Sequence, residues 1–161
     1  MLYLAGVGNY SASDDGIGLR LVEAVAQRGL DRGFRAVDLS KGCLELLHYM
    51  DPDTEGILVV DCARMGRSPG EYAFFRPDGV RTRKPSAGFS THEGDLLKAV
   101  ALARELGRTL PPLELMGIEP ADTSPGFELS EPLKKGFEGY VSAAVRRCLS
   151  MARPNAPEVG G

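Results

Sequence analysis

Two aspartates and one histidine are the residues of this sequence whose types could combine into a metal-binding site. Asp15 follows the apolar run that begins the chain, Asp61 directly follows the apolar residues 57–60, and His92 lies at the start of a later helical pattern. Two carboxylates and one imidazole form a mixed oxygen and nitrogen ligand set of borderline hardness. Such a set suits nickel, zinc, iron or manganese, and geometry must decide among them.

Each of these residues also has an ordinary structural explanation. An aspartate just inside a helix N-terminus usually caps the helix or complements its dipole, and this is the role we expect for Asp14. Asp61 abuts a buried apolar strand, so its carboxylate needs partners that offset the desolvation, although it could also cap the following turn. A histidine in the first turn of a helix is more often a surface or capping residue than a ligand.

The elements that must position these residues follow from the hydrophobic pattern. Apolar runs predict strands at residues 2–7, 34–39, 57–60, 72–75 and 113–118. Helical spacing predicts helices at residues 17–29, 44–50, 90–107 and from 130 onward; the third begins with the capping-box pattern Ser90-Thr91-His92-Glu93 and the last with Pro132 in its first turn.

Strands that alternate with helices predict right-handed βαβ units and a parallel sheet covered on both faces. Residues 72–79 break the alternation and are expected as an antiparallel or edge addition. The fold class is therefore α/β, a three-layer α/β/α sandwich with a mostly parallel twisted sheet, phosphorylase- or hydrolase-like. Ligands of open parallel sheets bind beyond the carboxyl ends of the strands, which places Asp15, Asp61 and His92 on one rim.

The composition excludes several classes of function. A chain of 161 residues suits one domain, which we expect at residues 1–152, followed by a Pro- and Gly-rich flexible tail at 153–161. The net charge of −3 is spread without a basic stripe, which argues against nucleic-acid binding, and no apolar run is long enough to span a membrane. Three scattered cysteines and the absence of a signal-peptide pattern indicate a cytoplasmic protein.

Two further kinds of site have weak support in the sequence. Gly6-Val7-Gly8 before a helix resembles part of a dinucleotide fingerprint, but Ser11 stands at the third glycine position and two acids lie where a pyrophosphate would bind. Cys62 lies beside Asp61, whose charge would raise the pKa of the thiol and suppress the nucleophilic thiolate. We expect Cys62 to be a small buried residue.

Four segments together carry a family resemblance: GVGNYSASDDGIGLRLVE at 6–23, VVDCARMG at 59–66, STHEGDLLKAV at 90–100 and LELMGIEP at 113–120. In composition, order and spacing they resemble the hydrogenase maturation endopeptidases, which remove a C-terminal peptide from the nickel-containing large subunit of hydrogenase. The segments cover about two-thirds of the chain, and the first is specific as a block.

The resemblance implies roles for individual residues. The metal-contacting acids of the family fall on Asp15 and Asp61, and its histidine falls on His92. These groups are implied to hold no resident metal and to recognise the nickel already inserted in the hydrogenase large-subunit precursor. Asp15 or Asp61 is also implied as the catalytic general base, and the nickel could polarise a carbonyl; the choice stays open.

Two positions depart from the family pattern. The first acid is often Glu in relatives, whereas Asp15 is one methylene shorter. Relatives also tend to have an Asp-Gly-Gly-Thr type of loop where this chain has Asp38-Leu39-Ser40-Lys41-Gly42. If that loop reads the substrate, the difference implies a different large subunit as substrate.

Two other functions remain open at this point. The chain could be a non-enzymatic metal-sensing or chaperone module that docks a metal-bearing partner without cutting it. It could also be a different hydrolase on a phosphorylase-like fold, with an anion site made of Arg64, Arg67 and Ser68.

Overall fold

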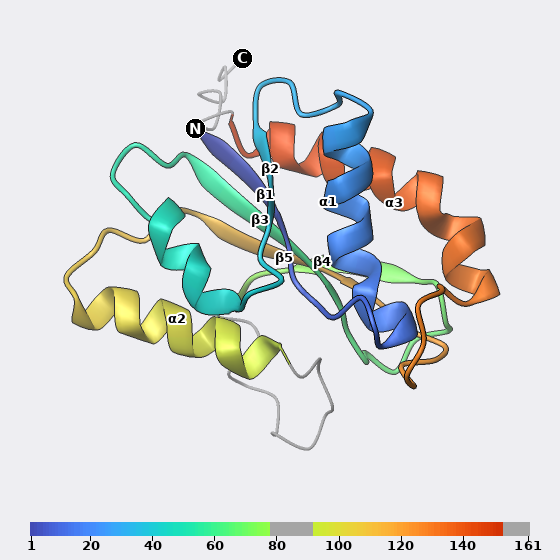
Figure 1. Cartoon of the computed structure of the whole chain (residues 1–161). Helices are drawn as coiled ribbons and strands as arrows, with labels where there is room; N and C mark the ends of the chain where they lie inside the picture. Colours follow the sequence, from blue (N-terminus) through green and yellow to red (C-terminus); the bar gives the residue numbers. More distant parts are fainter. Residues whose placement is uncertain (78–91, 153–161) are drawn as a thin grey trace, which may run out of the picture.

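The computed structural model describes residues 1–77 and 92–152, and these form a five-stranded sheet with helices on both faces (Figure 1). The strands are β1 (Leu2–Gly6), β2 (Arg35–Asp38), β3 (Gly56–Cys62), β4 (Tyr72–Phe75) and β5 (Leu113–Ile118). The helices are α1 (Ile17–Gln27), α2 (Glu93–Glu105) and α3 (Glu131–Ser150), with 3-10 helices η1 (Ser13–Gly16) and η2 (Cys43–Tyr49).

The sheet has the strand order β2-β1-β3-β5-β4. The first four strands of this order pair in parallel, and β4 pairs antiparallel with β5 at the edge. Both parts of the prediction for residues 72–75 are therefore correct, since this strand is antiparallel and lies at an edge. The α/β fold with a mostly parallel sheet is confirmed.

Two hydrophobic cores lie on the two faces of the sheet. Alternate residues of β3 divide between them, because successive side chains of a strand point to opposite faces. Leu58 and Val60 pack with α1 and α3, whereas Ile57 and Val59 pack with η2 and α2. Figure 1 shows the same division, with α1 and α3 on one side of the sheet and α2 on the other. Every residue of β3 is buried, as its uninterrupted apolar run predicts.

Helix α1 lies unusually close to the sheet because of glycines in the first sequence segment. A Cβ atom on Gly18 would lie 2.6 Å from the carbonyl oxygen of Val7 and closer still to that of Val60. A Cβ atom on Gly6 would in turn overlap the carbonyl of Gly18. This close packing holds the turn η1, and with it Asp15, against the carboxyl ends of β1 and β3.

The local structure differs from the prediction in several places. Residues 43–49 form a 3-10 helix in place of the expected α-helix, and a 3-10 turn precedes α1. The last helix begins as expected, with Ser130 as its N-cap and Pro132 in its first turn. Residues 78 and 79 of the expected edge addition, Ser90 and Thr91 of the capping box, and the predicted tail at 153–161 lie outside the described residues.

The domain boundary at residue 152 stays a prediction. Within the described ranges, none of the helices combines the length and apolar character that a membrane crossing requires.

Candidate active site

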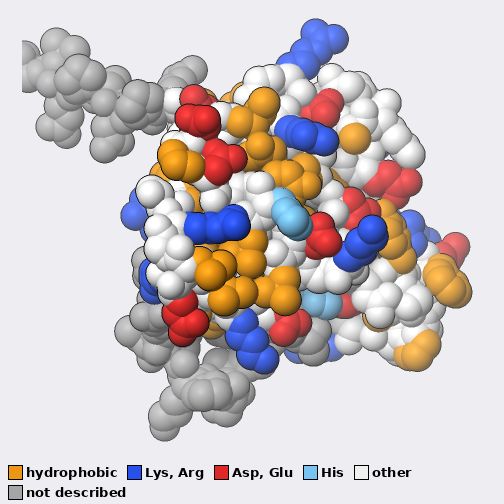
Figure 2. All heavy atoms as spheres, turned by 60° about the vertical axis from the view of Figure 1, so that its left-hand side comes forward, with side chains coloured by type: hydrophobic (Ala, Val, Ile, Leu, Met, Phe, Trp, Pro, Cys, Tyr) orange, Lys and Arg blue, Asp and Glu red, His pale blue; other side chains and the backbone are white. Residues whose placement is uncertain are grey.

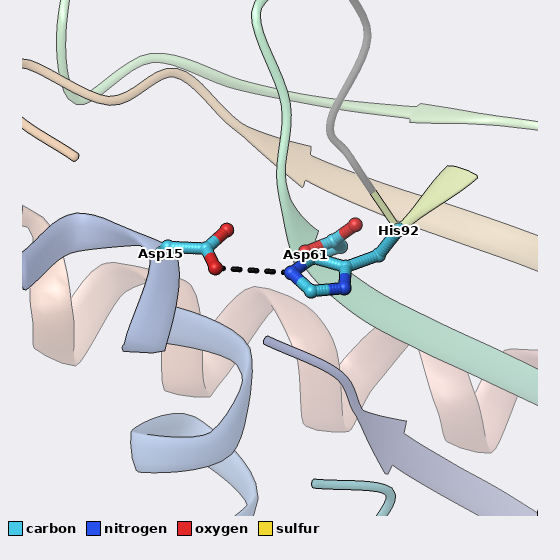
Figure 3. A group of neighbouring side chains, drawn as sticks. All are labelled: Asp15, Asp61 and His92. Carbon is cyan, nitrogen blue, oxygen red and sulfur yellow. Dashed lines mark hydrogen bonds and ion pairs between the residues drawn. The ribbon is translucent and has the colours of Figure 1, made fainter. Parts of the chain in front are cut away.

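Asp15, Asp61 and His92 come together at the carboxyl ends of the parallel strands (Figure 3). Asp15 belongs to η1, Asp61 is the penultimate residue of β3, and His92 is the N-cap of α2. The Nε2 atom of His92 lies 3.0 Å from Oδ2 of Asp15. One ligand atom from each residue lies within 4.8 Å of the other two. The predicted proximity is thus present, whereas the roles of these residues in metal recognition and catalysis stay predictions.

The three side chains differ in their access to solvent. Asp61 is buried, with 6% of its surface exposed, while Asp15 and His92 are half-buried. A small cavity of about 20 Å³ adjoins Asp61 and His92 and is otherwise lined mainly by apolar side chains, among them Val59, Phe75 and Leu96. The site therefore has a carboxylate at its base and two polar side chains toward solvent, which suits contact with a group brought by another molecule.

The electrostatics of the site favour a positive charge. The hydrogen bond with Asp15 raises the pKa of His92, as do the negative charges of Asp61, Asp15 and Asp95, while burial acts in the opposite direction. A metal ion binds a neutral imidazole, so a metal at this place would displace the proton of His92. Two carboxylates and one imidazole at these separations could hold a divalent ion of borderline hardness and leave further coordination positions for ligands from a partner.

Asp14 lies in the first turn of η1, where an acid complements the helix dipole, but it does not cap the helix as also considered. Its side chain is completely buried and makes no cap bond to η1 or α1. It accepts hydrogen bonds from the backbone N–H groups of Ala121, Asp122 and Ser130 and from the hydroxyl of Ser130, at 2.7–3.0 Å. Asp14 therefore joins η1 to the connection between β5 and α3, and this junction fixes the backbone next to Asp15.

Glu119 is a further buried acid, and the sequence reasoning missed it. Its carboxylate accepts hydrogen bonds from the backbone N–H groups of Met65 and Arg67, and so orders the loop that follows β3 and Asp61. The sequence signal was available, because Glu119 directly follows an apolar strand in the same way as Asp61.

The three residues considered for an anion site, Arg64, Arg67 and Ser68, make hydrogen bonds within the loop after β3 or to nearby residues. Arg64 donates a hydrogen bond to the hydroxyl of Thr123, and the backbone N–H groups of Arg67 and Ser68 are taken up by Glu119 and Glu71. These contacts belong to the folding of the loop after β3, and the anion site there stays a prediction.

The cysteines are poor nucleophiles. Burial, followed by the charge of Asp61, raises the pKa of Cys62 far above its ordinary value, and burial raises that of Cys43 to about 11 and that of Cys148 to about 12. All three side chains are buried free thiols, in agreement with the expectation for Cys62.

Comparison with known proteins gives consistent results. The family model described as "Hydrogenase maturation protease" (HycI) matches residues 19–147. The curated relatives include a hydrogenase expression/formation protein HupD from Rhodobacter capsulatus, 25% identical over 155 residues that cover 96% of this chain and 72% of the relative. The protein HupM from Azotobacter chroococcum mcd 1 is 27% identical over 146 residues, with 89% and 69% covered.

Solved structures of hydrogenase maturation proteases have a similar fold. The hydrogenase maturating endopeptidase HybD from E. coli superposes with a TM-score of 0.72 at 25% identity, covering 91% of this chain and 93% of that one. The [NiFe] hydrogenase maturation protease HybD from Thermococcus kodakarensis has a TM-score of 0.70 at 23% identity, covering 95% and 100%. The family model spans well over half of the chain, and we conclude that this chain belongs to the hydrogenase maturation proteases and is an endopeptidase of that type.

Proposed function

We propose that this endopeptidase removes the C-terminal peptide of a nickel-hydrogenase large-subunit precursor after it recognises the nickel already inserted there. The observation that carries the proposal is the cluster of Asp15, Asp61 and His92, whose ligand atoms lie within 4.8 Å of one another at the edge of the sheet. Nickel enters as part of the substrate, and the enzyme holds no resident metal of its own. The enzyme works in the cytoplasm, without nucleic acid or membrane as partner.

The geometry supports recognition of a metal that is already held elsewhere. Three protein ligands from three separate elements leave coordination positions free for ligands of the precursor. Docking the precursor's nickel against Asp15, Asp61 and His92 fixes the position of the scissile bond relative to the enzyme. Such positioning converts an encounter of two proteins into an effectively intramolecular reaction.

The same residues supply the acid–base chemistry of peptide hydrolysis. Asp15 or Asp61 accepts the proton of the attacking water, and the nickel polarises the carbonyl that is attacked. Asp61 is buried next to an apolar cavity, whereas Asp15 is in contact with the imidazole of His92. Both aspartates stay candidates for the base.

A cleavage assay with defined precursors tests this function. Purified nickel-loaded and nickel-free large-subunit precursors are incubated with the enzyme, and the mass of the precursor's C-terminal region is followed by mass spectrometry. The wild-type enzyme is expected to shorten the nickel-loaded precursor and to leave the nickel-free precursor uncut. Asp61→Asn is expected to lower the rate by about 10²-fold or more, because general acid–base groups typically contribute about 10²–10⁴-fold. His92→Ala removes one of the three proposed nickel-contacting groups and is expected to slow cleavage of the nickel-loaded precursor as well.

Matched control variants separate effects on the candidate active site from effects on folding. Asp53→Asn and His48→Ala change exposed residues of the same types and are expected to keep full activity. Circular dichroism checks that all variants are folded. Equal cleavage of nickel-free and nickel-loaded precursor, or full activity of both site variants, would contradict the proposal.

A further inference from the structure

We infer that Phe127, whose backbone is held by neighbouring segments, is an apolar anchor for the hydrogenase large-subunit precursor, placed beside the cluster of Asp15, Asp61 and His92. The inference rests on the proposed function and names a contact that the metal-recognising residues do not make. Its evidence lies in three features of the described residues: the exposure of the phenylalanine ring, the fixation of its backbone and its position.

Phe127 is the most exposed of the large hydrophobic side chains in the part of the chain that the structure describes, at 73%. A single exposed hydrophobic residue is common on protein surfaces and carries no meaning by itself. The usual expectation for such a residue on a loop is that its backbone is loosely held, so that the ring can turn toward the nearest apolar surface. The contacts around Phe127 contradict that expectation.

The backbone at Phe127 is held by η1 and by α1. The N–H of Gly126 donates to the carbonyl of Ser11, and the N–H of Ser13 donates to the carbonyl of Gly126, both at 2.9 Å. The guanidinium of Arg20 donates a hydrogen bond to the carbonyl of Phe127 itself. These bonds come from both sides of the residue and fix its backbone, while the residue stays 73% exposed.

Arg20 is in turn fixed by its neighbours. Its guanidinium lies 5.7 Å from the centre of the Tyr10 ring, in the range of a cation–π contact. The hydroxyl of Tyr10 donates a hydrogen bond of 3.0 Å to Glu23 of α1. The segment that carries Asp15 and the segment that carries Phe127 are therefore tied into one unit.

This unit places Phe127 next to the candidate active site. Gly126 bonds to Ser13, which lies two residues before Asp15, and a Cβ atom on Gly126 would lie 2.8 Å from Oγ of Ser13. A precursor that presents its nickel to Asp15 must cover the surface immediately around that carboxylate. The ring of Phe127 then lies within the covered area.

A second exposed side chain lies in the segment that contacts His92. Leu44 is 58% exposed, and the thiol of its neighbour Cys43 donates a hydrogen bond of 3.7 Å to the carbonyl of His92. Exposed apolar side chains thus occur both in the segment bonded to the turn of Asp15 and in the segment bonded to His92. Figure 2, which brings the left-hand side of Figure 1 forward, shows hydrophobic side chains gathered on the surface between acidic and basic ones.

The physical advantage of the anchor is that its backbone is already ordered before the precursor binds. Aromatic side chains dominate the energetics of many interfaces, and a side chain that is already fixed loses less conformational entropy when a partner covers it. Phe127 is aromatic, and the hydrogen bonds on either side of it order its backbone before a partner binds. The partner surface that suits it is an apolar pocket or patch next to the nickel centre of the precursor.

The test is steady-state cleavage of the nickel-loaded precursor by wild type, Phe127→Ser, Phe127→Leu and Leu106→Ser. Leu106 is the matched control, because it is 57% exposed and lies at the far end of α2, about 20 Å from His92 at 1.5 Å per residue. Phe127→Ser is expected to raise KM at least tenfold with kcat unchanged within twofold. Phe127→Leu is expected to restore most of the affinity, and Leu106→Ser to match wild type.

The outcomes distinguish this inference from the proposed function. An unchanged KM in Phe127→Ser, with a wild-type enzyme that cuts the precursor, would overturn the anchor alone. A wild-type enzyme that leaves the nickel-loaded precursor uncut would overturn both. Sedimentation measurements are included, because conversion of a wild-type dimer to a monomer by Phe127→Ser would show that the ring binds a second copy of this chain, and would likewise overturn the anchor.

Discussion

The buried carboxylate of Asp14 offers the sharpest test of how this fold positions its site. Asp14→Asn keeps the size of the side chain but replaces one acceptor oxygen by an NH₂ group. In the structure, one oxygen of Asp14 accepts from the N–H groups of Ala121 and Asp122 and from the Ser130 hydroxyl, and the other accepts from the N–H of Ser130. In either orientation the new amide nitrogen faces at least one buried N–H donor.

The expected cost follows from these contacts. A buried donor left without a partner costs about 1–3 kcal/mol, and the bonds that persist lose the strength that the carboxylate charge gives them. We expect Asp14→Asn to lower the free energy of unfolding by about 2–5 kcal/mol, a large part of the roughly 5–15 kcal/mol typical of a domain. Ser130→Ala removes the hydroxyl donor alone, and about 1 kcal/mol should be lost.

Urea unfolding followed by far-ultraviolet circular dichroism measures this loss, since the sequence has no tryptophan for fluorescence. Asp53→Asn is the control, because Asp53 is an exposed acid in the turn before β3, and its unfolding midpoint should equal that of wild type. The dependence of the unfolding free energy on urea should be similar in all variants. A midpoint for Asp14→Asn indistinguishable from wild type would refute the role of Asp14 as the junction between the two loops.

Two further predictions concern the packing of α1 and the charge of His92. Gly18→Ala should prevent stable folding, because its Cβ would overlap the carbonyl of Val60. Gly139→Ala, in an exposed and open position of α3, should raise the free energy of unfolding by about 1 kcal/mol, as measured by thermal unfolding. Equal effects of the two changes would contradict the close packing. The hydrogen bond with Asp15 raises the pKa of His92 in the folded state. The contribution of this pair to stability is therefore complete below the unfolded pKa of about 6.5. It is lost as the pH rises through the folded pKa. His92→Gln should therefore lower the urea midpoint more at pH 6 than at pH 9, and an equal loss at both pH values would show that the ion pair contributes nothing.

Much of the fold follows from local patterns in the chain. The apolar run at 57–60 predicted a strand buried on both faces, and the alternation of strands and helices predicted the parallel sheet. The ligand rule for such sheets then predicted that Asp15, Asp61 and His92 share one edge, because each follows a strand or begins a helix at that edge. These inferences succeed because hydrophobic periodicity and chain direction are properties of neighbouring residues.

The tertiary structure alone decided which acids act as supports and which line the site. Asp14 and Asp15 are adjacent, yet one is buried among backbone donors more than a hundred residues away in the sequence and the other faces His92. The sequence contains no local signal for this division, because the donors that bind Asp14 come from the distant connection between β5 and α3.

The exposure of Phe127 has the same origin. A phenylalanine in a loop reads locally as a residue that should be buried, and only the structure shows its exposure and the hydrogen bonds from η1 and Arg20 that hold its backbone. The sequence by itself therefore determined the elements, the sheet and the edge at which the chemistry lies. The three-dimensional contacts between loops determined the orientation of each side chain there, since hydrogen bonds between distant segments depend on how the finished elements pack.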